Sequence, residues 1–164
     1  PAPQEGPQAR LVRLRRQTHA LKAFPPPIPM HTLHLATACL INPERQLLVV
    51  RKRGSPFWML PGGKIDAGET ALQALQRELQ EELQWQAPMD HLQPLAHFEN
   101  RAANEADTRV QAQVFYARLA HTPAVQIATE IEAMVWLALD GPHPATLAPL
   151  LHEQVLPALQ QMAD

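Results

Sequence analysis

The sequence predicts an α/β domain built on a mixed β-sheet. Short apolar segments bounded by turn residues recur on both sides of one amphipathic helical pattern, and a second helical pattern closes the chain. Because these segments do not alternate as strict strand–helix–strand units, a mixed sheet fits better than a purely parallel one. The 164 residues, of which 46 % are hydrophobic and 18 % charged, suit one globular domain with a proper core.

The N-terminal segment, residues 1–29, differs from the rest of the chain. It runs from a polar, Pro-rich stretch through the basic, partly helical stretch ARLVRLRRQTHALKAF to PPPIP, which stops a helix. We expect either a loosely held leader or short docked helix, or else an arm for dimerisation or for an acidic partner. Residues 30–164 then form the domain, and Met30 is compatible with a natural start.

Strands are expected on both sides of the central helix. Five segments have the length and apolar content of strands: 31–41, 46–50, 91–99, 109–119 and 131–139. The turn NPER joins the first two, and the polar stretch NRAANEADT joins the third and fourth into an expected hairpin. The short apolar piece FWML leads into a loop, PGGK. The last helix should cover about 145–161 and break near Pro157.

The central helix should cover residues 71–83. Thr70 followed by Gln73 makes a capping box, which predicts a clean start at Ala71. At about 100° per residue, one stripe should be buried and the glutamines should face solvent. The stripe consists of Leu72, Leu75, Leu79 and Leu83.

Three carboxylates, Glu78, Glu81 and Glu82, share a third sector of this helix. Like charges three or four residues apart cost roughly 0.2–0.5 kcal/mol each, and the helix dipole disfavours anions near the C-terminal end. No Lys or Arg follows one turn later to offset them. A solvated acidic face is one interpretation. The other is that a hard divalent cation supplies the missing charge, since Mg²⁺ prefers clustered carboxylate oxygens.

The preceding segment, PGGKIDAGET, extends this hypothesis. Gly62 and Gly63 allow backbone groups to approach a ligand closely. Glu69 could reach the guanidinium of Arg77, and such a pair would hold the loop against the helix.

Composition excludes several other classes. The net charge of −2 offers no positive field for duplex nucleic acid. No apolar run approaches the ~20 residues of a membrane span, and no signal peptide is visible at the N-terminus. The single cysteine, Cys39, lies in the apolar run LATACLI and is expected to be a buried thiol. We therefore expect a cytoplasmic protein.

The loop and helix resemble the Nudix box, whose pattern is G-x5-E-x7-R-E-U-x-E-E-x-G-U with U a bulky apolar residue. Gly63, Glu69 and the run RELQEE (77–82) occupy its fixed positions, and Trp85 occupies the closing bulky position. The one departure is Gln84, which stands where the pattern has Gly. If the helix ends there in a left-handed turn, the non-Gly residue costs about 1–2 kcal/mol; otherwise the helix runs on and turns later.

The resemblance implies an α/β/α sandwich in which the box forms a loop–helix–loop. It also implies cation-dependent hydrolysis of a nucleoside diphosphate linked to another group, with Mg²⁺, or Mn²⁺ in its place, as cofactor. By position, the metal ligands are Glu78, Glu81, Glu82 and the carbonyl of Gly62. Arg77 and Glu69 orient the helix and the loop.

The remaining roles also come from the resemblance. The general base is Glu78 in some members and a glutamate outside the box in others. Here Glu130 and Glu132 precede a strand, and we favour Glu130 because it lies further into the loop. Substrate contacts fall to Arg51, Gly63 and Lys64.

The substrate stays open at this point. A modified dNTP and an ADP-ribose or NDP-sugar type of nucleotide are both compatible with the chain. The prototype that reads oxidised guanine uses an Asn near its last helix, whereas no Asn follows Asn104 here. Many relatives are homodimers, which residues 1–29 would suit. The alternative is a degenerate Nudix module that binds a nucleotide or a protein partner without catalysis, and Gln84 is the feature that favours it.

Overall fold

The computed structural model describes residues 30–162, so the expectations for residues 1–29 lie outside the described part of the chain. Within residues 30–162, seven strands form one mixed sheet. They are β1 His31–Ile41, β2 Gln46–Lys52, β3 Trp58–Met59, β4 Gly62–Lys64, β5 Gln93–Arg101, β6 Thr108–Arg118 and β7 Ile131–Ala138. The five segments expected as strands are confirmed, with ends shifted by one or two residues.

The long strand β1 organises the sheet. It runs parallel to β6 along its whole length, and β6 in turn pairs with β5 as the predicted antiparallel hairpin. The other edge of β1 is divided between two partners. Ile41 pairs with Leu47 of β2, whereas Leu35–Thr37 pairs with β4. The segment PGGK, expected as a loop, thus contributes a short strand at this division.

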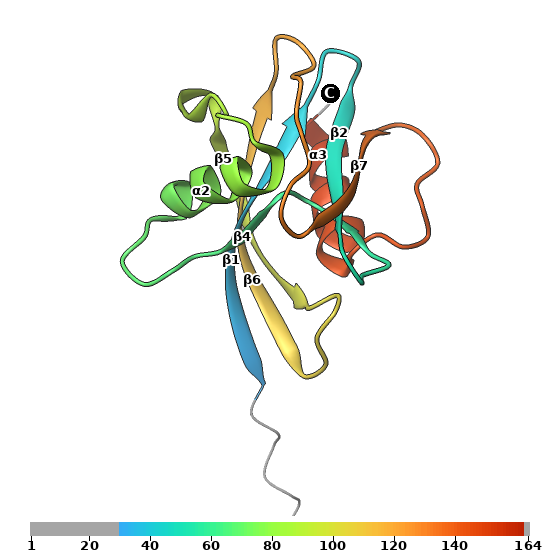
Figure 1. The fold of residues 1–164 in the computed structure, drawn as a ribbon. Helices are drawn as coiled ribbons and strands as arrows, with labels where there is room; N and C mark the ends of the chain where they lie inside the picture. The colour runs from blue at the N-terminus through green and yellow to red at the C-terminus, as the bar shows by residue number, and fades with distance from the viewer. Residues whose placement is uncertain (1–29, 163–164) are drawn as a thin grey trace, which may run out of the picture.

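The sheet lies between two helical layers (Figure 1). Helix α2, Ala71–Leu83, covers one face, and the C-terminal helical segment of η2, Leu151–Val155, and α3, Leu156–Met162, covers the other. Alternation along β1 supplies both cores, since Ala38 and Leu40 pack with α2 while Cys39 packs with α3. This arrangement confirms the α/β/α sandwich. A short 3₁₀ turn, η1 Met89–His91, follows α2.

Two expectations about the helices are wrong in detail. Leu72, expected in the buried stripe, is 38 % exposed, and the fully buried residues of α2 begin at Ala74. The last helical segment begins at Pro149, not 145, and is continuous through Pro157. The Leu156 N–H donates to the Leu151 carbonyl and forms a π-turn. Pro157, which has no N–H to donate, comes directly after this widened turn.

No helix among residues 30–162 is long and apolar enough to cross a membrane.

Candidate active site

The predicted start of α2 is confirmed by its capping box. The Gln73 N–H donates to the Thr70 hydroxyl at 3.2 Å, and the Thr70 N–H donates to the Gln73 side chain at 2.9 Å. Both bonds satisfy amides that have no partner within the helix. The helix axis is therefore set at the point where the preceding loop enters.

Arg77 joins that loop to the helix. Its Nε and Nη2 donate to the two carboxylate oxygens of Glu69 at 2.8 and 3.1 Å, and Nη2 also donates to the Lys64 carbonyl at 3.0 Å. This bidentate contact confirms the expected pair, and it lowers the pKa of the Glu69 carboxyl. Nη1 donates to Glu78 at 2.9 Å and lies 3.9 Å from Glu81. Arg77 thus supplies part of the positive charge that the three carboxylates lack on the following turn of the helix.

The three carboxylates have different surroundings. The Glu81 side chain is 53 % exposed, whereas that of Glu78 is 17 % exposed and faces Arg77. Glu82 is only 4 % exposed, and its nearest donor is the Gly62 N–H at 3.4 Å. Burial raises the pKa of Glu82 to about 8, with Lys52 acting in the opposite direction.

The glycines of β4 are required by close packing. Gly62 has a φ of +137°, and a Cβ there would overlap the Ala36 carbonyl of β1. A Cβ on Gly63 would overlap the carboxylate of Glu78. The backbone of β4 therefore lies directly against the Glu78 side chain of α2.

The possible metal ligands around Gly62 have the chemistry that a hard cation prefers. They are carboxylate and carbonyl oxygens, and Glu82 is buried without an ion-pair partner in the described part of the chain. Among residues 30–162, however, no three acidic, His or Cys side chains already converge as a metal cage. The carboxylate of Glu78, which Arg77 engages here, would have to turn toward the other two.

The C-terminal end of α2 is held by the segment before β7. The Gln126 and Ala128 N–H groups donate to the Leu83 and Glu82 carbonyls at 3.0 and 2.9 Å, and the Thr129 hydroxyl donates to the Glu81 carbonyl at 2.8 Å. These carbonyls have no partner within the helix. The contacts bring the loop that contains Glu130 to the end of α2 that carries the carboxylates.

The helix ends at Gln84 in a left-handed turn, with φ 48° and ψ 42°. The sequence allowed the helix either to end at Gln84 or to run on and turn later, and the structure shows the first of these. The Gln84 N–H still donates to the Gln80 carbonyl at 3.1 Å, so the last turn is regular. A non-Gly residue therefore adopts the backbone conformation for which Gly is favoured.

Arg51 and Lys52 differ in their surroundings. Arg51 lies over the Trp58 ring at 5.3 Å and pairs with Glu132 at 3.6 Å. Lys52 pairs with Glu130 at 3.6 Å and lies near enough to Glu82 to favour its charged form. Lys52 is thus a better placed candidate than Arg51 for the substrate contact that was predicted for Arg51. Alternation along the strand signalled that the two side chains would diverge.

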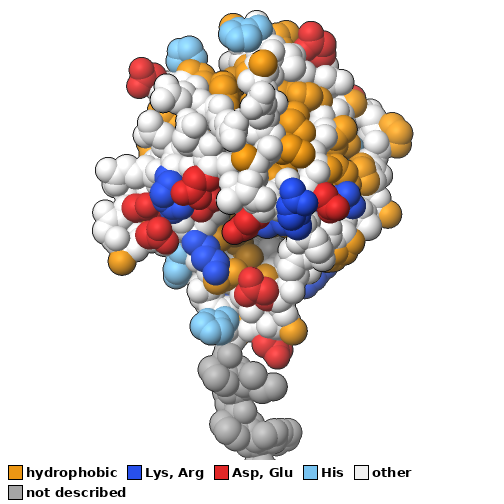
Figure 2. Space-filling view, viewed as in Figure 1, with side chains coloured by type: hydrophobic (Ala, Val, Ile, Leu, Met, Phe, Trp, Pro, Cys, Tyr) orange, Lys and Arg blue, Asp and Glu red, His pale blue; other side chains and the backbone are white. Residues whose placement is uncertain are grey.

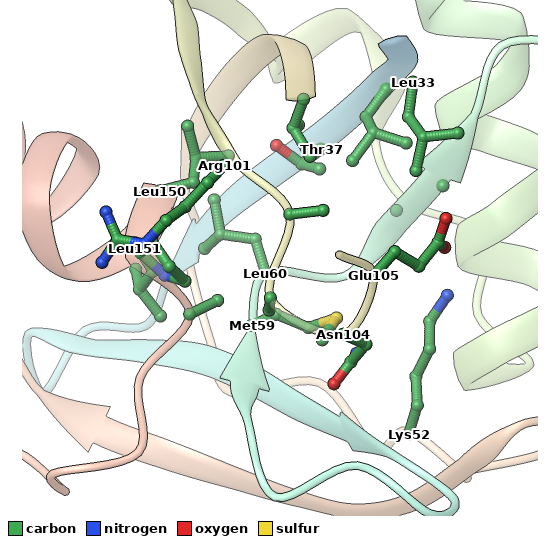
Figure 3. Close-up of a pocket in the computed structure, with 18 of the residues that line it drawn as sticks. Leu33, Thr37, Lys52, Met59, Leu60, Arg101, Asn104, Glu105, Leu150 and Leu151 are labelled. Carbon is green, nitrogen blue, oxygen red and sulfur yellow. The ribbon is translucent and has the colours of Figure 1, made fainter. Parts of the chain in front are cut away.

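A pocket lies beside β4, between the sheet and the loop after β5 (Figure 3). In the close-up, Thr37, Met59 and Leu60 form its middle, with Arg101 and Leu151 on one side and Lys52 on the other. Gly63 and Lys64 belong to its lining, whereas Arg51 and Trp58 do not. An apolar pocket with a few polar groups is typical of small-molecule sites.

The lining of the pocket includes four charged residues, Lys52, Lys64, Arg101 and Glu105. Figure 2 shows Lys, Arg, Asp and Glu side chains gathered in a band across one face of the molecule, which is hollowed beneath the band.

Asn104 is a pocket residue that sequence reasoning did not assign. It comes from the loop between β5 and β6, and the buried Ser55 hydroxyl donates to its side-chain oxygen at 2.7 Å. Ser55 also accepts from the Phe57 N–H at 3.1 Å. Nothing local in the sequence signalled this contact, because the two loops are 49 residues apart.

Comparisons with curated proteins find local sequence matches. A putative 8-oxo-dGTP diphosphatase of Bacillus subtilis (strain 168) is 39 % identical over 54 residues, which cover 33 % of this chain and 36 % of that protein. Phosphatase NudJ of Escherichia coli (strain K12) is 37 % identical over 60 residues, which cover 35 % and 39 %. The match thus spans little more than a third of the length of either curated relative.

The fold comparison extends much further along the chain. The crystal structure of a MutT NUDIX hydrolase from Burkholderia pseudomallei is 26 % identical with a TM-score of 0.61, covering 80 % of this chain and 98 % of that one. The family model of the NUDIX domain matches residues 32–159, from the start of β1 into α3. That range contains the sheet, the box helix and the pocket, and the chain therefore belongs to the NUDIX domain family.

Proposed function

We propose that the chain is a divalent-cation-dependent pyrophosphohydrolase that cleaves a nucleoside diphosphate linked to another group. The observation that carries this proposal is the burial of Glu82 beside Gly62, without an ion-pair partner in the described residues and on the same helix end as Glu78 and Glu81. A buried carboxylate is costly unless it is neutralised or paired. A bound cation next to the substrate phosphates would supply that pairing.

Glu78, Glu81, Glu82 and the Gly62 carbonyl would hold Mg²⁺, or Mn²⁺ in its place. When bound, the cation would neutralise phosphate charge and lower the pKa of a bound water. Its oxygen ligands suit a hard cation better than a soft one.

The remaining residues either orient the loop and the helix or transfer a proton. Arg77 and Glu69 keep the loop against α2, supported by their two short hydrogen bonds. Glu130 is the general base that takes the proton of the attacking water, supported by the attachment of its loop to α2. Glu78 is the other candidate for this role. Glu132 is the weaker one, because it lies within β7 and not in the loop that is attached to α2.

Substrate phosphates are bound by Lys52, Lys64 and the Gly63 backbone, which belong to the lining of the pocket, and Lys52 takes the role that the family resemblance assigned to Arg51. The rest of the substrate occupies the apolar pocket, where the Asn104 amide can donate to an acceptor on a base.

A small nucleotide is the substrate class that we propose for this pocket, and a modified dNTP is our first choice. The similarity to a putative 8-oxo-dGTP diphosphatase supports it, and an ADP-ribose or NDP-sugar nucleotide is the other class. We further propose a cytoplasmic protein that forms homodimers and binds no nucleic acid duplex, in keeping with its net charge of −2 and its buried thiol Cys39.

The test is turnover of a substrate panel with Mg²⁺ or Mn²⁺. Phosphate or nucleotide release from dNTPs, oxidised dNTPs, ADP-ribose and NDP-sugars identifies the class. Glu81→Gln and Glu82→Gln should each abolish most of that turnover. Glu99→Gln, which removes an exposed carboxylate of β5, is the matched control and should not. Full turnover in both helix variants would count against the metal-binding roles of these carboxylates, whereas no turnover of any substrate would favour the non-catalytic module instead.

A further inference from the structure

The loop before β7 contains a strained residue beside the proposed general base. Thr129 has a φ of +57°, in the left-handed region that β-branched residues rarely adopt. Such a conformation persists only where its surroundings hold it, and it is enriched at functional sites. The Ile131 N–H donates to the Ala128 carbonyl at 3.2 Å and closes the turn around it.

This conformation directs the Thr129 side chain to α2. Its hydroxyl donates to the Glu81 carbonyl at 2.8 Å, across 48 residues of sequence. The neighbouring Ala128 N–H donates to the Glu82 carbonyl at 2.9 Å. The loop is therefore attached through the backbone of the two residues whose side chains are proposed to hold the cation.

Glu130, the next residue along the chain, is held through its own backbone carbonyl. The Glu130 carbonyl accepts from the Arg53 N–H at 2.8 Å, and its carboxylate lies 3.6 Å from Lys52 Nζ. The Glu130 side chain is itself 72 % exposed, so packing does not hold it in place. Its position relative to α2 depends on the backbone contacts at its two ends.

We propose that Thr129 is a positioning residue whose hydroxyl fastens the Glu130 loop to the carboxylate-bearing end of α2. The inference rests on the proposed function, in which Glu130 takes a proton from the attacking water. Loss of the hydroxyl would leave the strained turn without its contact to Glu81 and would let Glu130 move away from the helix. Misplacement of a catalytic group by about 1 Å lowers the rate steeply.

Two substitutions separate the hydroxyl from the shape of the side chain. Thr129→Val keeps the branched shape and removes the hydroxyl, whereas Thr129→Ser keeps the hydroxyl. Thr122→Val makes the same change at an exposed threonine that donates to Glu44, and serves as the matched control. Each protein is assayed for kcat and KM with Mg²⁺ on the best substrate, and for amide hydrogen exchange of Ala128 and Arg53.

Thr129→Val should lower kcat about tenfold with little change in KM, and Thr129→Ser should restore it. Exchange at Ala128 should accelerate in Thr129→Val and not in Thr122→Val. In a Glu130→Gln background, Thr129→Val should have no further effect on kcat, because it acts through Glu130. An equal additional loss in that background, or unchanged kcat in Thr129→Val, would overturn the proposal.

Hydrogen exchange also separates this proposal from the proposed function. If the unmodified chain turns over no substrate, the proposed function fails. Unchanged exchange at Ala128 in Thr129→Val would then show independently that the hydroxyl does not hold the loop.

Discussion

Gly63 and Glu78 lie so close together that a Cβ on Gly63 would overlap the Glu78 carboxylate. We expect Gly63→Ala to displace Glu78 from the site, because the alternative is to move β4, which pairs with β1. Turnover should fall by at least about tenfold, since displaced catalytic groups lose activity steeply. Gly141→Ala is the control, as its Cβ would meet only the Ala138 side chain at 3.3 Å. Equal activity of the two variants would contradict the importance of this contact.

Gln84→Gly should change stability modestly and leave turnover within about tenfold of the unmodified protein. Glycine removes the cost of the left-handed conformation at φ 48° but adds flexibility to the unfolded chain, and the two effects oppose each other. Chemical denaturation measures the change in stability, and steady-state kinetics measures the change in turnover. A much larger gain in activity would mean that Gln84 restrains catalysis.

The stability of the metal-free protein should fall as the pH rises from about 4.5 to about 8. Burial raises the pKa of Glu82 to about 8, so the folded protein holds a proton that the unfolded chain releases near 4.5. The folded state therefore binds more protons throughout this window, and its free energy of unfolding decreases with pH. Urea unfolding in a chelator measures this trend. Glu82→Gln should flatten it, and an identical pH dependence in that variant would assign the effect to other groups.

Lys52→Met should raise KM about tenfold, because a charged contact to phosphate contributes roughly 1.5 kcal/mol. Arg51→Met should leave KM little changed, since Arg51 interacts with Trp58 and Glu132 outside the pocket. Steady-state kinetics of the two variants, measured side by side, shows which of the two residues contacts the substrate. The opposite order would return the substrate contact to Arg51.

Local patterns in the sequence predicted much of the fold. The bounds of α2, its capping box and the hairpin of β5 and β6 were all anticipated, because each depends on residues near one another along the chain. The pair of Glu69 and Arg77 belongs to the same class, at a separation of 8 residues. The short strand β4 was missed, since its pairing depends on where β1 lies.

The sequence by itself determined the family, the acidic helix and the glycines beside it, because these follow from residue types at fixed spacing. Only the tertiary structure decided that Glu82 is buried, that Lys52 lies at the pocket, and that Thr129 contacts Glu81. Each of these depends on segments that are distant in sequence, such as the 48 residues between Glu81 and Thr129. Their relative positions come from packing of the whole sheet between its two helical layers, which no local pattern contains.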